Sequence, residues 1–238
     1  MSKLIWDKDD ERFYQTGIDQ VALYVMDNGS YGTGVAWSGV SGITETPGGA
    51  ESNKIYADNI EYLNLISNET MEGTITAYFS PEEFDACDGL ASPVAGVNFG
   101  QQGRKSFGLA YRTRIGSNQD GDSHAYMIHL LYNCKASPSE RAYSTTNDSP
   151  EATELSWSIS MTKTVVGKIN DVEYKPLCLI TIDSRKFTSE NAKAALKAFE
   201  EQLWGRDADS TASPAVEALT PTLPTPAQVI SQLTVANG

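Results

Sequence analysis

The chain has 238 residues and a formal net charge of −13, from 18 Lys and Arg against 31 Asp and Glu. This length suits one large domain with a real core, or one domain with appendages. A protein that grips nucleic acid needs clustered cations to displace counterions, so the charge disfavours specific DNA or RNA binding. The excess lies mainly in residues 1–110, with 6 Lys and Arg against 16 Asp and Glu, and its simplest interpretation is solubility.

The N-terminal segment and the cysteines indicate in which cellular compartment the protein is found. MSKLIWDKDDERF is acidic and lacks the apolar region of a secretory signal, and no run approaches the roughly eighteen apolar residues that cross a bilayer. We therefore expect the protein to be made and kept in a cytoplasm, without membrane association. Cys87, Cys134 and Cys178 are odd in number and far apart, which is typical of small buried hydrophobes and not of a disulfide framework or a metal site.

The first predicted elements are strands joined by a long connection. GSYGTGVAW, residues 29–37, has no third glycine and no following helix, so it predicts a glycine-rich turn that enters a strand. In ITETPGGAESNKIYADNIEYLNL, residues 43–65, a Pro-Gly-Gly break separates two alternating patterns across about a dozen polar residues. A connection of this length is uncommon without a function. A catalytic, a binding, an assembly or an ordinary surface loop all remain open.

The next segment predicts a strand followed by a short helix. EGTITAYF, residues 72–79, alternates with its apolar side chains on one face. Ser80-Pro81-Glu82-Glu83 has the pattern of a capping box with proline at the first helical position. The pattern predicts a short helix that continues to about Asp88 and caps one end of the fold.

The centre of the chain predicts a hairpin. GQQGRKSFG, residues 100–108, approaches a phosphate-binding loop, but Arg104 occupies the glycine position and an alternating strand follows in place of a helix. The segment is therefore interpreted as a turn into the strand 106–115. Turn-forming residues between 116 and 122 then lead to the strand 124–134. Their spacing does not match a calcium-binding EF-hand loop.

The strand patterns together predict the fold class. Residues 124–134 and 176–182 are apolar on both faces and indicate central or interface strands, whereas residues 153–165 alternate. About eight strands separated by turn signals predict a mainly β protein with an antiparallel sandwich or barrel-like fold.

The C-terminal part predicts a helix and a tail. TSENAKAALKAFEEQLWG, residues 188–205, is amphipathic, with Thr188 as the expected cap and Gly205 as the stop. Its expected apolar stripe consists of Ala195, Leu196, Phe199 and Leu203. Residues 206–238 are rich in Pro, Thr and Ala, which is linker composition, with one turn of helix expected from Pro226 to Leu233. The predicted organisation is a β domain over 1–187, a helix over 188–205 and a tail over 206–238.

The sequence offers no catalytic constellation. His124 and His129 are the only histidines and are five residues apart on a predicted strand, so their side chains point to opposite faces and cannot share a metal ion or a relay. No nucleophile motif of the Gly-x-Ser-x-Gly type accompanies them. We expect no enzyme activity, no catalytic residue, no metal and no cofactor.

The order of motifs resembles a known family. YADN (56–59), SPEEF (80–84) and TTNDSPEA (145–152) follow one another between the strand patterns. In this combination the chain resembles the major tail (tail tube) proteins of long-tailed bacteriophages that infect Gram-positive bacteria. The resemblance covers about residues 5–185, and the segment after residue 187 is less typical.

The resemblance implies a structural role. It implies a β-sandwich with a flanking helix, assembled as hexameric rings that stack into a tube in the virion tail, after synthesis in the host cytoplasm. The expected partners are other copies of the chain, a tape-measure protein and a tail terminator. DNA passes through the lumen during ejection, without sequence-specific binding, and an acidic wall repels phosphates at close range, within the roughly 8 Å that salt leaves unscreened.

In such proteins a long loop between early strands reaches the neighbouring ring, and residues 44–60 match it by position and length. Tyr56 is an interface anchor type, and Asp58-Asn59 can pair with backbone groups. The expected contact residues are Glu45, Pro47, Glu51, Lys54, Tyr56, Asp58 and Asn59. Strands that are apolar on both faces also need cover, which a neighbouring subunit could supply.

Two alternatives remain open. The first is a β-sandwich binding module, for example for carbohydrate, with Trp37, Tyr31 and Tyr56 as candidate aromatics on one sheet face. The second is a related tube-like component, such as a tail terminator or the inner tube of a contractile tail.

Overall fold

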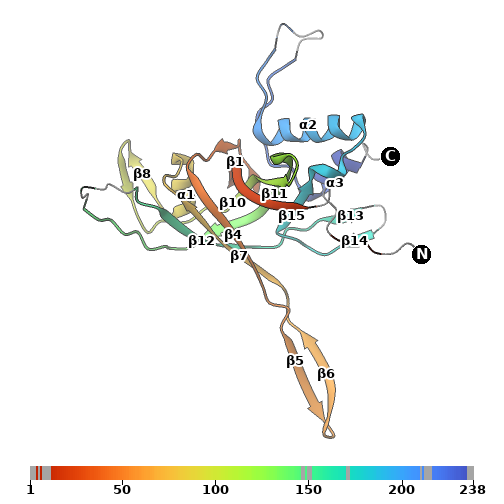
Figure 1. Ribbon diagram of the computed structural model, residues 1–238. Coiled ribbons are helices and arrows are strands. Elements are labelled where there is room, and N and C mark those ends of the chain that lie inside the picture. The colour runs from red at the N-terminus through yellow and green to blue at the C-terminus, as the bar shows by residue number, and fades with distance from the viewer. Residues whose placement is uncertain are drawn as a thin grey trace.

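The computed structural model describes residues 4, 6, 12–145, 148, 152–169, 172–209, 211 and 216–234. These residues form a mainly β body with two helices on one side and a β-hairpin that projects from the opposite side (Figure 1). The predicted fold class, a mainly β antiparallel sandwich or barrel-like fold, is confirmed.

Within the described residues, the main sheet has nine strands in the order β2-β1-β10-β11-β12-β7-β4, with β15 also paired to β11 and β3 to β1. Every pairing between its strands is antiparallel. Its strands are β1 (Phe13–Asp27), β2 (Ser30–Tyr31), β3 (Val35–Ala36), β4 (Val40–Gly48), β7 (Thr70–Ala77), β10 (Phe107–Ser117), β11 (Gly121–Ala136), β12 (Leu155–Met161) and β15 (Leu179–Asp183). The smaller hairpins are β5 (Ser52–Ala57) with β6 (Ile60–Ile66), β8 (Ala91–Val94) with β9 (Val97–Phe99), and β13 (Gly167–Ile169) with β14 (Val172–Tyr174).

The long strand β11 divides the sheet. Its middle pairs with β15 at Met127–Leu131, and its end pairs with β12 at Cys134–Ala136. The sheet can therefore continue along two paths and enclose a core between them. The centre of this first core is aromatic, because the ring of Phe84 lies 4.5 Å from Trp37 and 5.4 Å from both Trp157 and Phe107.

A second core lies on the other face of the sheet, under α2 (Glu190–Trp204) and α3 (Pro226–Thr234). Ile128, Leu130 and Tyr132 of β11 are fully buried in this core, whereas Leu131 belongs to the first. Alternate residues of one strand thus enter two cores, as the side-chain period of two requires. The cover that a neighbouring subunit could have supplied for this strand comes from helices of the same chain.

The observed bounds of helix α2 agree with those predicted from the sequence, except at its start. Its N-cap is Ser189, whose Oγ accepts from the Ala192 backbone N at 3.1 Å, and not the expected Thr188. It ends as expected at Gly205, where φ is 84°. The stripe is buried at Leu196, Phe199 and Leu203, while Ala195 is half-buried.

The tail is not a free linker in its described part. Leu223, Val229 and Leu233 are buried in the second core, and the hydroxyl of Tyr132 donates to the Pro224 carbonyl at 3.0 Å. Composition misjudged this segment because a few spaced apolar side chains suffice to anchor an extended, proline-rich chain. The predicted helix at Pro226 is present and spans nine residues.

The predicted short helix is present, but the predicted capping box is not formed. A 3₁₀ turn (Glu82–Phe84) leads into α1 (Asp85–Asp88), and the N-cap of that turn is Pro81, with no side-chain cap bond. The helix is held instead by burial of Phe84 and Cys87.

Candidate functional site: an exposed β-hairpin arm

The connection after β4 forms a projecting hairpin. We call residues 50–67, which include β5 and β6, the arm. Figure 1 shows the arm extending from the β4–β7 pair, away from α2. At the junction Gly49 has a φ of 77°, and a Cβ there would collide with the Asn68 carbonyl, so glycine is required. The Pro-Gly-Gly break of the sequence thus marks the point where the chain leaves the body.

The tip of the arm is a two-residue turn. Ala57 pairs with Ile60, and the φ angles of Asp58 and Asn59 between them are 51° and 64°. Two consecutive positive φ values define a type I′ turn, which matches the twist of a hairpin, and Asp and Asn tolerate these angles. Asp58-Asn59 therefore sets the register of the arm.

One face of the arm is polar. Ser52 and Lys54 alternate along β5, and Asn64 lies opposite Lys54. The hydroxyl of Ser52 donates to Asn64 Oδ1 at 2.6 Å, and Lys54 Nζ lies 2.8 Å from Glu61 Oε2. These polar groups pair with one another across the two strands, so they need no further hydrogen-bond partner from another protein.

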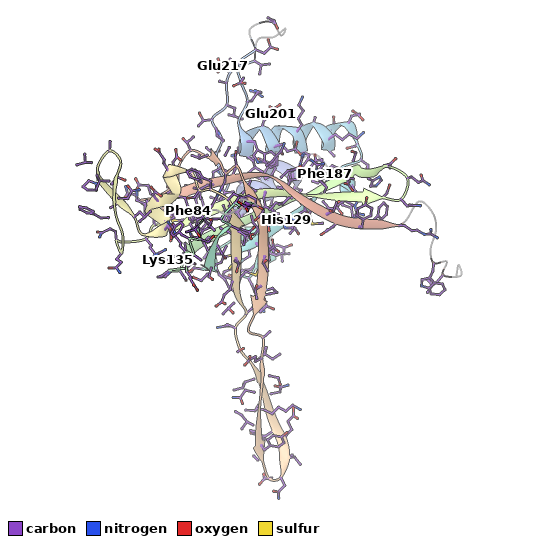
Figure 2. All side chains as sticks on the ribbon, turned by 60° about the vertical axis from the view of Figure 1, so that its left-hand side comes forward. Phe84, His129, Lys135, Phe187, Glu201 and Glu217 are labelled. Atoms are coloured by element: carbon purple, nitrogen blue, oxygen red, sulfur yellow. The ribbon has the colours of Figure 1, made fainter. Side chains whose placement is uncertain are left out.

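The other face of the arm is apolar and uncovered. The register places Ile55 opposite Leu63 and Ala57 opposite Ile60. The apolar side chains on this face remain exposed to 39% at Ile55, 63% at Ile60, 47% at Leu63 and 51% at Leu65. In Figure 2 the arm stands clear of the body, with its side chains projecting sideways along its length. An isolated two-stranded hairpin is marginal in water, and a contiguous exposed apolar surface marks an interaction site.

A polar cluster anchors β4, the strand that leads into the arm, to the rest of the body. Glu45 of β4 accepts from the hydroxyl of Tyr111 and lies 3.0 Å from His129 Nδ1. The His129 ring stacks on Tyr111 with centroids 4.7 Å apart, and its Nε2 lies 3.1 Å from Thr113 Oγ1. Figure 2 shows His129 where the arm's supporting strands meet the body. The cluster therefore joins β4 to β10 and β11.

The electrostatics of Glu45 follow from this setting. Partial burial alone would raise the pKa of the Glu45 carboxyl, but the hydrogen bonds from His129 and Tyr111 outweigh it, so the pKa lies below its usual 4.5. The carboxylate is thus charged at neutral pH and holds both donors in place.

The cluster has a carboxylate–imidazole–hydroxyl order that local sequence patterns could not reveal. Its members Glu45 and His129 lie 84 residues apart in the chain. Groups in this order can orient an imidazole or move a proton. Here the Tyr111 hydroxyl also bonds to the Glu45 carboxylate, and its ring stacks on the His129 ring. The geometry therefore favours a structural role, holding the strand that leads into the arm, over proton transfer.

The structure divides the seven predicted contact residues between two places, the strand β4 and the arm. Glu45 and Pro47 lie in β4, where they pair with Gly73 and Met71. The other five lie in the arm: Glu51 at its base, Lys54 and Tyr56 along β5, and Asp58 and Asn59 at its tip. Tyr56 is 64% exposed.

The sequence interpretation missed the first strand of the arm. Residues 44–60 were expected to be a polar loop before a second alternating pattern, but Ser52–Ala57 form the strand β5, which pairs with β6. The available signal was a pair of turn formers, Asp58-Asn59, between two alternating runs, which is the pattern of a two-residue hairpin.

The three aromatics of the carbohydrate alternative do not share an exposed face. Trp37 is 3% exposed and donates its indole N–H to the Phe79 carbonyl at 2.8 Å inside the first core. Tyr31 is half-buried, and its hydroxyl accepts from the Asn133 backbone N at 2.9 Å. Tyr56 alone is exposed, so this aromatic platform does not exist.

Within the described residues, no group of three or more His, Cys, Asp or Glu side chains is placed to hold a metal ion. The helices of the same residues are all too short or too polar to cross a bilayer.

Comparisons with known proteins give little guidance. No protein-family model matches the chain, and no curated protein matches it. Among solved structures, a chain from the cryo-EM structure of the anti-feeding prophage (AFP) baseplate, 6-fold symmetrised, aligns over 76% of this chain and 97% of its own. The two share 9% identity at a TM-score of 0.32, and we base no argument on this similarity.

Proposed function

We propose that this protein is a structural virion protein whose copies form stacked hexameric rings, the tail tube of a long-tailed bacteriophage. The observation that carries the proposal is the arm, whose apolar face is exposed although the rest of the chain builds two closed cores. The resemblance of the motif series to tail tube proteins gives the class of assembly.

The arm favours a repeating assembly. A projecting hairpin that contacts a different surface on a second copy makes a heterologous contact, which closes into rings or continues as a filament. Each copy would then both donate an arm and accept one. A stack of rings meets this requirement in every layer except the two at its ends, where other proteins must take over. A tape-measure protein inside the tube and a terminator at its end are the partners that the resemblance to tail tube proteins implies.

The charge suits a conduit for DNA. A wall with the same sign as the phosphates does not retain the genome during ejection, and the chain carries a net charge of −13. In this proposal the protein binds no cofactor, performs no catalysis and resides in the virion tail after assembly in the host cytoplasm.

The test is electron microscopy of the purified protein, with sedimentation to measure its assembly. The full chain should form rings or tubes. A variant that lacks residues 50–67, with Gly49 joined to Asn68, keeps the β4–β7 pairing, which begins at Gly48 and Thr70, and should not stack.

A matched control replaces Ser52 on the polar face of the arm by alanine, and this variant should assemble normally. A full-length chain that stays monomeric at high concentration, or an arm-deleted chain that still forms tubes, would refute the proposal.

A further inference from the structure

An apolar groove lies on the side of the body opposite the arm. It has a volume of about 710 Å³ and lies between α2, the segment 218–222 and Gln232 of α3. Its apolar surface comes from Ala195, Ala198 and Leu219, above the buried ring of Phe199. Among the described residues, no charged side chain lines it.

Three polar residues of the groove, Gln202, Thr222 and Gln232, are hydrogen-bonded to one another. Gln232 Nε2 donates to Gln202 Oε1 at 2.8 Å, and Gln202 Nε2 donates to Thr222 Oγ1 at 3.4 Å. The Thr222 backbone N donates to the Gln202 carbonyl at 2.7 Å. An apolar occupant therefore finds hydrocarbon surface and leaves none of these groups without a hydrogen bond, which removes the main cost of docking there.

We propose that this groove receives the apolar face of the arm from a second copy of the chain. The inference rests on the proposed function, because it names the surface on which the arm would dock. Ile55, Leu63 and Leu65 share the face of the arm that would enter, whereas the Lys54–Glu61 ion pair lies on the other face and stays in water. Docking would bury no charged group on either surface, so it avoids the large desolvation free energy of a buried charge.

The positions of the two surfaces favour a contact between copies. In Figure 1 the arm leaves the body on one side and α2 lies on the other, so an arm cannot reach the groove of its own chain. The same contact repeated from copy to copy stacks them in one direction. The groove thus supplies the acceptor that a head-to-tail assembly needs.

A competing acceptor is the hairpin β8–β9, where Val94 is 66% exposed, Val97 48% and Phe99 56%. It projects from the body as a thin two-stranded ribbon in Figure 1, and a ribbon gives an incoming hairpin less surrounding contact than a groove. It therefore serves as the comparison surface in the test.

The first experiment uses engineered cysteine pairs. Cys87, Cys134 and Cys178 are buried, so an introduced surface thiol is the reactive one. The double variant Leu63→Cys with Ala198→Cys should give a ladder of disulfide-linked multimers on a non-reducing gel. The pair Leu63→Cys with Val94→Cys should not. A ladder from the second pair and none from the first would overturn the assignment of the groove.

The second experiment uses a charge. Ala198→Glu places a carboxylate in the groove and should raise the concentration needed for tube formation by at least about tenfold, because docking would bury it. Ala194→Glu lies one turn earlier on the same helix, is exposed and is not part of the groove, so it should assemble as the natural chain does. Circular dichroism should show that both variants are folded.

The two proposals fail in different ways. A natural chain that forms neither rings nor tubes refutes the proposed function. A natural chain that forms tubes, together with an Ala198→Glu variant that does so equally well and a groove pair that gives no ladder, refutes only the groove.

Discussion

The body and the arm use the same kinds of residue in opposite ways. In the body, aromatic and branched apolar side chains such as Trp157 and Ile75 are almost fully buried by other parts of the same chain. In the arm, Ile60 and Ile66 are more than 60% exposed although they lie in a regular strand.

The difference separates folding from assembly. The body has two cores and the contacts it needs to be stable alone. The arm has hydrogen bonds and a turn but no cover, so its apolar side chains gain little until a partner arrives. Substitutions in the two regions should therefore have different readouts, and the following experiments test that separation.

The largest expected effect on stability is in the first core. Phe84→Ala removes a fully buried ring that contacts Trp37, Phe107 and Trp157. We expect a loss of about 3–5 kcal/mol in the free energy of unfolding, measured by urea denaturation. An unfolding free energy within about 1 kcal/mol of the natural chain would show that the cores do not hold the body.

The opposite behaviour is expected in the arm. Leu63→Glu should weaken assembly by about 2 kcal/mol or more, as loss of a central interface anchor does, while the unfolding free energy of the monomer changes by no more than about 0.5 kcal/mol. Sedimentation and denaturation measure the two quantities. Asn64→Glu, one residue along on the polar face, is the matched control and should leave both nearly unchanged.

The cluster at the root of the arm should contribute to the stability of the body. Glu45→Gln removes the charge that holds Tyr111 and His129, and we expect a loss of about 1–3 kcal/mol in the free energy of unfolding. Thermal unfolding at neutral pH measures it. Full stability of this variant would mean that the cluster does not fix the root.

The same group predicts a pH dependence. The pKa of Glu45 is lowered in the folded protein from an ordinary value of 4.5, so its stabilising contribution is present above pH 4.5 and is lost as the pH falls through the lowered pKa. Stability measured between about pH 5 and pH 2 should thus fall more steeply in the natural chain than in Glu45→Gln. Parallel curves would contradict the assignment.

The smallest effect is expected under α2. Burial raises the pKa of Glu200 and outweighs the hydrogen bond with Tyr126, and among the described residues its Oε1 is buried without a hydrogen-bond partner. A raised carboxyl pKa means that the charged form costs stability at neutral pH. Glu200→Gln should therefore stabilise the protein by at most about 1 kcal/mol, because solvent screens this partly exposed group, and the gain should vanish in acid.

The sequence predicted the body better than the arm for a physical reason. Periodic patterns such as 106–115 and 188–205 report which face of an element is buried, and the body buries those faces itself. The run 60–66 has the same apolar content, but a pattern does not say whether the cover belongs to the same chain. The polar residues before Tyr56 also concealed a paired strand, since in β5 they form its solvent-facing side.

Two further features depend on distance in the chain. The polar cluster assembles across three strands, from Glu45, Tyr111, Thr113 and His129. No local sequence motif predicts it. The groove needs α2 beside residues 218–222, whose docking rests on Leu223 and on the bond between Thr222 and Gln202. Composition gave that segment as a linker because proline-rich chains are usually unpacked.

The two-residue turn at Asp58-Asn59 has a consequence for how such a protein can change over generations. The strands that it joins form a separate two-stranded sheet, so inserting two residues into each would lengthen the hairpin by about 7 Å and preserve which side chains face which way. The body would be untouched by such an insertion. The reach between successive copies is thus a property that selection can adjust without endangering the fold.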